Sequence, residues 1–182
     1  MTNFNKYSKI AFIGSGGVGG AMSVALSANQ YPIVAAASRS FSSAKQLASR
    51  LKECQAVKTP QEAADLADIV IITTFDGVIG DVADNIRWRT GQGVVHCSGV
   101  TKLDVFESAV TQGAVAGSLH PLQAFASVEE AVESLPGSTF GIEAEGDMRD
   151  YLEKMALDLG GHPIFLKPSD RELYHASVVT LG

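Results

Sequence analysis

A glycine-rich segment near the start of the chain has the residue spacing that holds a diphosphate. Gly14, Gly16 and Gly19 form a GxGxxG pattern between the apolar run Ile10–Ile13 and a helical pattern. The first glycine permits a tight turn, the second lets the backbone approach a pyrophosphate, and the third lets helix and strand pack closely. The start of such a helix attracts phosphate through its N–H groups. We expect these residues to bind a dinucleotide, the alternative being a glycine-rich turn without a ligand: Gly14, Ser15, Gly16, Gly17, Val18 and Gly19.

The end of the second apolar run indicates which dinucleotide this is. An NAD site needs a carboxylate there to bond the ribose 2′-hydroxyl, and this chain instead has Ser38, Arg39 and Ser40. A guanidinium pairs with a 2′-phosphate through a bidentate fork, and hydroxyl groups, including that of Ser43, add donors. This pattern predicts NADP(H) as the cofactor. The alternative is a solvated Arg39 with serines that cap the next helix.

A third segment is placed beside the cofactor by its position alone. Thr74 and Phe75 follow an apolar strand pattern, and ligands of open α/β sheets bind beyond the carboxyl ends of the strands. We expect both residues to line the cofactor. Asp76 has an alternative interpretation as the N-cap of the helix that follows.

Hydride transfer also needs a group that donates a proton to the substrate or accepts one from it, and imidazole can do both near neutral pH. His120 ends a predicted strand and precedes Pro121, which holds it extended at the edge where substrate would sit. His120 is therefore the predicted catalytic residue, with a capping or loop role as the alternative. Ser98 is predicted to contact substrate or nicotinamide, while Gln123 and His175 are predicted to bind substrate.

The remaining histidines and the aromatic neighbour of His175 have simpler interpretations. His96 shares a strand face with Ser98 and is predicted to be a partly buried structural group. His162 follows two glycines behind a helix and is predicted to lie at the surface. Tyr174 could close the cleft, although packing explains it equally well.

These residues require a scaffold of alternating strands and helices. Apolar β-branched runs alternate with helical patterns, which is typical of βαβ units and a parallel sheet. We predict the Rossmann α/β fold, with strand order 3-2-1-4-5-6, helices on both faces and two additional edge strands. The predicted strands are Ile10–Ile13, Ile33–Ala37, Ala56–Lys58, Ile69–Thr73, Val94–Cys97 and Val115–Leu119, followed by Ser138–Ala144 and Pro163–Leu166.

Capping boxes predict where several helices begin. They start at Thr59, Ser127 and Ser169, and a further helix over Asp147–Leu159 is closed by a pair of glycines. The helix that starts at Ser169 stays apolar to the last residues of the chain. We therefore divide the chain into a dinucleotide-binding domain, 1–168, and the first helix of a C-terminal helical domain, 169–182.

Composition excludes several classes of partner. The formal charge of −6 and the pI near 5.1 are unfavourable for binding nucleic acid or an anionic membrane. Cys54 and Cys97 lie far apart and have no metal-ligand spacing, so neither a disulfide framework nor a metal site is predicted. The N-terminus has no signal-peptide pattern. We expect a cytoplasmic protein whose partner is a small-molecule substrate.

The chain resembles a family of Rossmann-like proteins that carry a C-terminal helical domain of unknown function. Four segments carry the resemblance: Ile13–Gly19, His96–Gly99, Leu119–Phe125 and Leu173–Ala176. That family is similar to the NADP oxidoreductases of the pyrroline-5-carboxylate reductase, deazaflavin-dependent and 6-phosphogluconate dehydrogenase-like group. The resemblance implies a helical domain of about a hundred residues that completes the cleft and forms a homodimer, whereas this chain stops in its first helix.

The resemblance also bears on the chemistry. His120-Pro121 resembles the His-Pro of prephenate dehydrogenases, which implies that the histidine contacts a substrate hydroxyl. The expected function is an NADP-dependent oxidoreductase that transfers hydride to or from a small carbonyl, alcohol or imine. The alternative is an NADP(H)-binding sensor or partner-binding module without turnover, because a fold does not imply a reaction.

Overall fold

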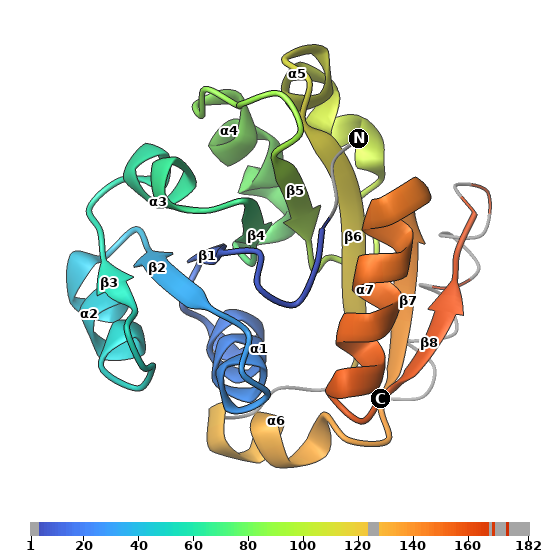
Figure 1. The fold of residues 1–182 in the computed structure, drawn as a ribbon, viewed down its shortest axis with the longest axis horizontal. Helices are drawn as coiled ribbons and strands as arrows, with labels where there is room; N and C mark the ends of the chain where they lie inside the picture. Colours follow the sequence, from blue (N-terminus) through green and yellow to red (C-terminus); the bar gives the residue numbers. More distant parts are fainter. Residues whose placement is uncertain (1–3, 124–127, 168, 170–173, 175–182) are drawn as a thin grey trace.

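A single mixed sheet organises the chain. The computed structural model describes residues 4–123, 128–167, 169 and 174, and eight strands within them form one sheet in the order β3-β2-β1-β4-β5-β6-β7-β8 (Figure 1). The strands are β1 (Ile10–Ile13), β2 (Ile33–Ala37), β3 (Gln55–Ala56), β4 (Ile69–Ile72), β5 (Gly93–His96), β6 (Val115–Leu122), β7 (Thr139–Ala144) and β8 (His162–Phe165). The predicted Rossmann order and both additional strands are confirmed.

Strand direction changes once across the sheet. The strands β1 to β6 pair in parallel, β7 runs antiparallel to β6, and β8 runs parallel to β7. Parallel neighbours need crossover connections, and the helical patterns between the first six strands supplied them. The direction of β7 was not part of the sequence prediction.

Helices cover both faces of the sheet because the central strands are apolar on both sides. Every residue of β1 and β4 is buried. One core joins Met22 of α1 and Leu152 of α7 to Phe12, and the other joins Ala63 of α3 and Ala83 of α4 to Ile72. The helices are α1 (Gly17–Ala28), α2 (Phe41–Ala48), α3 (Pro60–Leu66), α4 (Ile79–Asp84), α5 (Glu107–Thr111), α6 (Val128–Ser134) and α7 (Gly146–Asp158), with 3₁₀ turns η1 (Asp76–Val78) and η2 (Leu103–Phe106).

Two helix boundaries follow the predicted capping chemistry. The Thr59 hydroxyl accepts the Glu62 N–H at 3.1 Å, while the Glu62 carboxylate accepts the N–H of Lys58 at 2.8 Å. At the end of α7, Gly160 has φ +76°, and Gly161 N–H bonds the Ala156 carbonyl in a Schellman closure. The predicted caps at Ser127 and over 169–172 lie outside the described residues, apart from residue 169 itself.

The strand β6 is longer than predicted, and this changes the setting of His120. His120 and Pro121 do not follow the strand; they lie inside it, paired with Gly141 and Phe140 of β7. The parallel register with β5 ends at Ser118, so this part of β6 has one fewer neighbour and tolerates a residue without an N–H. The antiparallel partner extends the strand past the proline.

The structure contains no helix, within its described residues, that is long and apolar enough to cross a membrane.

The packing between α7 and β8 can be tested by adding a methyl group at Gly161. A methyl group at Gly161 would meet the Phe140 ring and the Ser138 carbonyl, and Phe140 is completely buried. We predict that Gly161→Ala lowers the free energy of unfolding by about 1 to 3 kcal/mol, measured by urea denaturation. Gly77→Ala is the matched control, because a methyl group there meets nothing within 4 Å, and it should change stability by less than about 0.5 kcal/mol. Equal stability of both variants would contradict this packing.

Candidate functional site

A cleft of about 830 Å³ opens at the carboxyl ends of β1, β2 and β4. In parallel α/β sheets this edge is where ligands bind. The cleft is lined by Ile13, Gly14, Ser15, Gly16, Gly17, Val18, Ser38, Arg39, Ser40, Ser43, Lys58, Pro60, Thr73, Thr74, Phe75, Asp76, Val78 and Val82. Every predicted cofactor residue except Gly19 is in this set.

The glycine turn is shaped by contact with the end of β4. Gly14 has φ +113°, and a side chain there would meet the Thr73 backbone at 2.7 Å. Gly19 packs beneath the turn and does not line the cleft. It must be glycine because a side chain there would collide with the Gly14 carbonyl and the Thr73 hydroxyl. The Thr73 hydroxyl donates to the Gly14 carbonyl at 2.9 Å. These contacts hold the turn against β4.

The same turn leaves room for an anion at the start of α1. A methyl group at Gly16 would meet nothing within 4 Å, so the backbone is open on the cleft side. Gly16 is the N-cap of α1, with no side-chain hydrogen bond, and the first turn contains no acidic residue. The positive end of the helix dipole is therefore neither capped by a side chain nor neutralised by a carboxylate. This arrangement fits a pyrophosphate.

The loop after β2 carries the hydroxyl groups and the cation that the sequence predicts there. The Ser15 hydroxyl donates to that of Ser38 at 2.9 Å, and the hydroxyls of Ser40 and Ser42 lie 2.6 Å apart. Ser40 is the N-cap of α2, yet its side chain makes no capping bond. The alternative in which serines cap this helix is therefore not supported at Ser40. Arg39 is exposed and lines the cleft.

The segment after β4 provides a polar atom without a protein partner. The Thr74 hydroxyl oxygen is buried and has no hydrogen-bond partner among the described residues. Buried hydroxyl groups are rarely left unpaired, so this atom fits a ligand contact. Phe75 is 82% exposed on the cleft wall and is the N-cap of η1, whereas Asp76 is its first residue. The interpretation of Asp76 as the N-cap is wrong.

Lys58 is a cleft residue that the sequence analysis missed. It was predicted as the last residue of the third strand, whereas β3 ends at Ala56 and Lys58 follows it at the cleft wall. The signal that could have found it is its position at the carboxyl end of a parallel strand. Ser43, predicted as an additional donor, also lines the cleft.

His120 lies beside the loop that follows β5. The parallel register of β5 and β6 ends with the pair His96 and Ser118, two residues before Ser98 and His120. Gly99, the residue after Ser98, packs against His120, since a methyl group there would lie 2.8 to 3.1 Å from three atoms of the His120 ring. The Ser98 hydroxyl accepts the N–H groups of Val100 and Thr101 at 3.2 and 3.0 Å, which fixes this loop.

The His120 ring is half-buried and also contacts Tyr174. Its Nδ1 lies 3.0 Å from the Tyr174 hydroxyl, and the two rings are nearly perpendicular at a centroid distance of 5.7 Å. Tyr174 itself is 8% exposed. A hydroxyl at Nδ1 restricts the orientation of the ring and can serve either tautomer of the imidazole, because it can donate or accept a hydrogen bond. Neither His120 nor Ser98 is among the residues that line the 830 Å³ cleft.

The structure separates the remaining polar candidates. Gln123 is exposed just after β6, and His175 lies outside the described residues. His96 is completely buried, more so than predicted, and its Nδ1 accepts the Ser98 N–H at 3.2 Å. His162 is exposed as predicted, although it is the first residue of β8. The substrate-binding roles of Gln123 and His175 stay predictions.

Thiol chemistry has no support at either cysteine. Burial raises the pKa of Cys97 to about 12, and its Sγ lies 3.6 Å from the Met22 sulfur in the core. Burial also raises the pKa of Cys54, to about 11. Both groups are therefore protonated at neutral pH, and the thiolate is the form that acts as a nucleophile.

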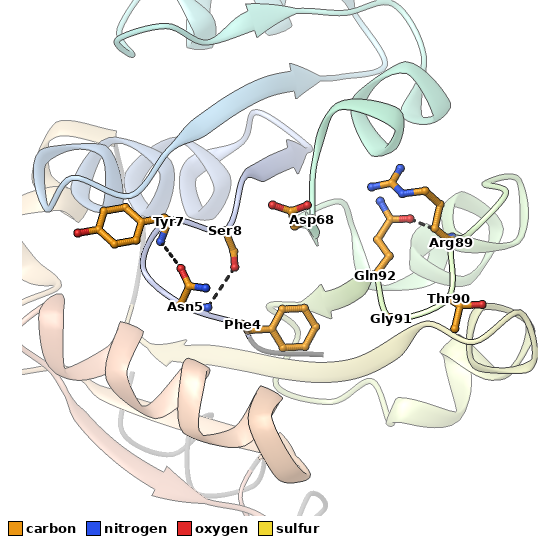
Figure 2. A pocket seen from close by; sticks show the side chains of 9 residues that line it. All are labelled: Phe4, Asn5, Tyr7, Ser8, Asp68, Arg89, Thr90, Gly91 and Gln92. Carbon is orange, nitrogen blue, oxygen red and sulfur yellow. Dashed lines mark hydrogen bonds between the residues drawn. The ribbon is translucent and has the colours of Figure 1, made fainter. Parts of the chain in front are cut away.

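A smaller cavity of about 370 Å³ lies at the amino ends of β1, β4 and β5, and it has a structural explanation. Figure 2 shows its lining, which consists of Phe4, Asn5, Tyr7, Ser8, Asp68, Arg89, Thr90, Gly91 and Gln92. The Arg89 guanidinium donates to the carbonyls of Ala64 and Ala67, and the buried Gln92 amide donates to the same two oxygens. These polar groups satisfy the end of α3, so the chemistry of this cavity is that of a helix C-terminus.

Comparison with solved structures identifies the same architecture elsewhere. A protein of Bacteroides fragilis, described provisionally as an NADP oxidoreductase, is 22% identical with a TM-score of 0.80, over 97% of this chain and 67% of that chain. Mycobacterium tuberculosis 3-hydroxyisobutyrate dehydrogenase, solved with L-serine, is 17% identical with a TM-score of 0.78, over 96% and 60%. A reductive aminase from Aspergillus terreus, in complex with NADPH and ethyl-5-oxohexanoate, is 13% identical with a TM-score of 0.74, over 96% and 60%.

These likenesses concern the fold, because the identities are low. The chain spans 60 to 67% of the length of the three structures. A search of the curated proteins finds no match to this chain. A family model described as a Rossmann-like domain matches residues 5–121, which include the glycine turn, the cleft and His120. The chain therefore belongs to the Rossmann-like domain family.

Proposed function

We propose that this protein is an NADP(H)-dependent oxidoreductase that transfers hydride to or from a small carbonyl, alcohol or imine. The observation that carries the proposal is the joint placement of the glycine turn and Arg39 in one cleft. The turn fits a pyrophosphate, and a guanidinium stands where an NAD-specific site needs a carboxylate. The substrate within these classes is left open by the residues of the site.

Different residues of the cleft bind different parts of the cofactor. The backbone of Gly14–Val18 takes the pyrophosphate, Arg39 with Ser38 and Ser40 takes the 2′-phosphate, and Thr74 and Phe75 line the cofactor after β4. The unpartnered Thr74 hydroxyl gains a hydrogen-bond partner when the cleft is filled. Two of the three solved structures support this assignment, since one is described as an NADP oxidoreductase and another binds NADPH.

The residues around His120 would handle the substrate proton. NADPH, when bound, supplies the hydride that reduces the substrate carbon. His120 donates a proton to the substrate oxygen or nitrogen as the hydride adds to the neighbouring carbon. In the reverse direction it accepts this proton. The Tyr174 hydroxyl, 3.0 Å from Nδ1, orients the imidazole for this transfer. Ser98 positions the loop that carries Gly99 against the ring and contacts the substrate, with Gln123 and His175 as further contacts.

A binding module without turnover is the second candidate function. It is favoured by one observation, namely that neither His120 nor Ser98 lines the cofactor cleft of this chain. In this form the protein senses or presents NADP(H), and the His120 contact with Tyr174 is structural. NADPH consumption with small ketones, aldehydes and imines distinguishes the two functions, since the module binds NADPH and consumes none.

The assembly proposed here follows the family resemblance. Segment 169–182 begins a second, helical domain beyond the dinucleotide-binding domain 1–168, and the homodimer forms through this helical region. The expected location is the cytoplasm. Light scattering of the protein with and without 169–182 tests the dimer. The same number of chains per particle in both forms would contradict it.

The cofactor assignment predicts a selective effect of removing the guanidinium. Arg39→Ala should weaken NADPH binding by about 1.5 to 3 kcal/mol, because a charge-assisted contact to the 2′-phosphate is lost. NADH affinity should stay within about twofold, as expected for a change below 0.5 kcal/mol at a site the ligand does not contact. Calorimetric titration of both dinucleotides measures this, with Arg87→Ala, an exposed arginine away from the cleft, as the control. Equal affinity of the parent protein for NADPH and NADH would disprove the assignment.

The proton-transfer role predicts a separation of turnover from cofactor binding. His120→Asn should lower the rate of NADPH-dependent reduction by about 10² to 10⁴, with NADPH affinity nearly unchanged, because general acid catalysis is lost. His162→Asn is the control, since this exposed histidine on β8 lies outside the cleft. Unaltered turnover in the His120 variant would remove the residue from the mechanism.

A further inference from the structure

The cofactor cleft contains a second cation that the glycine and arginine signals do not account for. Lys58 lines the cleft together with Arg39, Ser40 and Ser43. The β2–β3 register pairs Ala36 with Ala56, and the Val57 N–H continues it by donating to the Ala36 carbonyl at 3.0 Å. One further step places Lys58 beside Ser38, next to Arg39. Two cations therefore lie at adjacent strand ends.

Neither cation is neutralised within the described part of the chain. No ion pair or hydrogen bond of the Arg39 guanidinium or the Lys58 ammonium to a described residue is found. The nearest carboxylate along the chain, Glu62, accepts the Lys58 backbone N–H at 2.8 Å and so serves the cap of α3. The one acidic residue of the cleft lining is Asp76, which belongs to the turn after β4.

We propose that Lys58 is a specificity-determining residue that binds the 2′-phosphate of the cofactor together with Arg39. This inference rests on the proposed function and names a contact that the sequence analysis did not assign. A protein with a net charge of −6 that leaves two cations unpaired at one end of a cleft attracts an anion there. A ribose 2′-phosphate carries nearly two negative charges at neutral pH, and one guanidinium neutralises only part of this. The flexible ammonium of Lys58 provides the second positive charge.

The experiment compares four ligands on matched variants of the full chain. Lys58→Gln removes the charge at similar length, Lys58→Arg restores it, and Lys52→Gln removes an exposed lysine that does not line the cleft. Dissociation constants are measured for NADPH, NADH, 2′,5′-ADP and 5′-AMP. Lys58→Gln should weaken NADPH and 2′,5′-ADP by about 5- to 30-fold, as expected for a charge-assisted contact at a partly exposed site. NADH and 5′-AMP should change by less than about twofold, because they lack the 2′-phosphate.

The remaining variants make the outcome decisive. Lys58→Arg should recover most of the NADPH affinity, and Lys52→Gln should match the parent for all four ligands. Loss of NADPH and NADH affinity to the same extent in Lys58→Gln, or loss of neither, would overturn the role of Lys58. If the parent protein prefers NADPH and Arg39→Ala removes the preference while Lys58→Gln does not, the proposed cofactor stands and only this inference fails. If the parent binds NADH as tightly as NADPH, the proposed function fails with it.

Discussion

The contact between the glycine turn and the end of β4 is the constraint on which the site depends. Gly14 and Gly19 approach Thr73 so closely that neither can carry a side chain, and the Thr73 hydroxyl bonds the Gly14 carbonyl. This contact brings the start of α1 to the carboxyl edge of the sheet, where Gly16 and Gly17 line the cleft. It also brings Thr74 and Phe75, which follow Thr73, into the lining of the same cleft. A wider turn would separate the phosphate site from these residues.

The parallel order of the strands extends this constraint along the sheet edge. Each parallel strand ends at the same edge, so Arg39 and Lys58, which follow β2 and β3, both line the cleft, while Gly99 after β5 packs against His120 of β6. The strands β1 and β4 lie between these two groups in the sheet. A ligand that reached from one group to the other would have to cross the ends of β1 and β4. The glycine turn and Thr74 lie along this path.

Sequence patterns were sufficient where a local rule determines the structure. The β1 and β2 boundaries, the cap at Thr59 and the Gly160–Gly161 closure each depend on residues a few positions apart, and all are confirmed. Long-range pairing was harder to predict. The continuation of β6 through Pro121 depends on β7 as an antiparallel partner, and no signal near His120 indicates it. Lys58 was missed for the same kind of reason, because its place in the cleft follows from the β2–β3 register.

The position of His120 shows why a motif and its chemistry must be argued separately. The His-Pro pair was expected at a strand end, and the antiparallel pairing with β7 holds it inside the strand, against Gly99 and the Tyr174 hydroxyl. An imidazole held by these contacts has a defined orientation, which suits proton transfer to a substrate that approaches from the cofactor cleft. The same contacts would serve equally well to pack a structural histidine. The catalytic role, unlike the structural one, requires a substrate atom within hydrogen-bond reach of the imidazole. Gly99 and Tyr174, which contact the ring, determine from which side such an atom approaches.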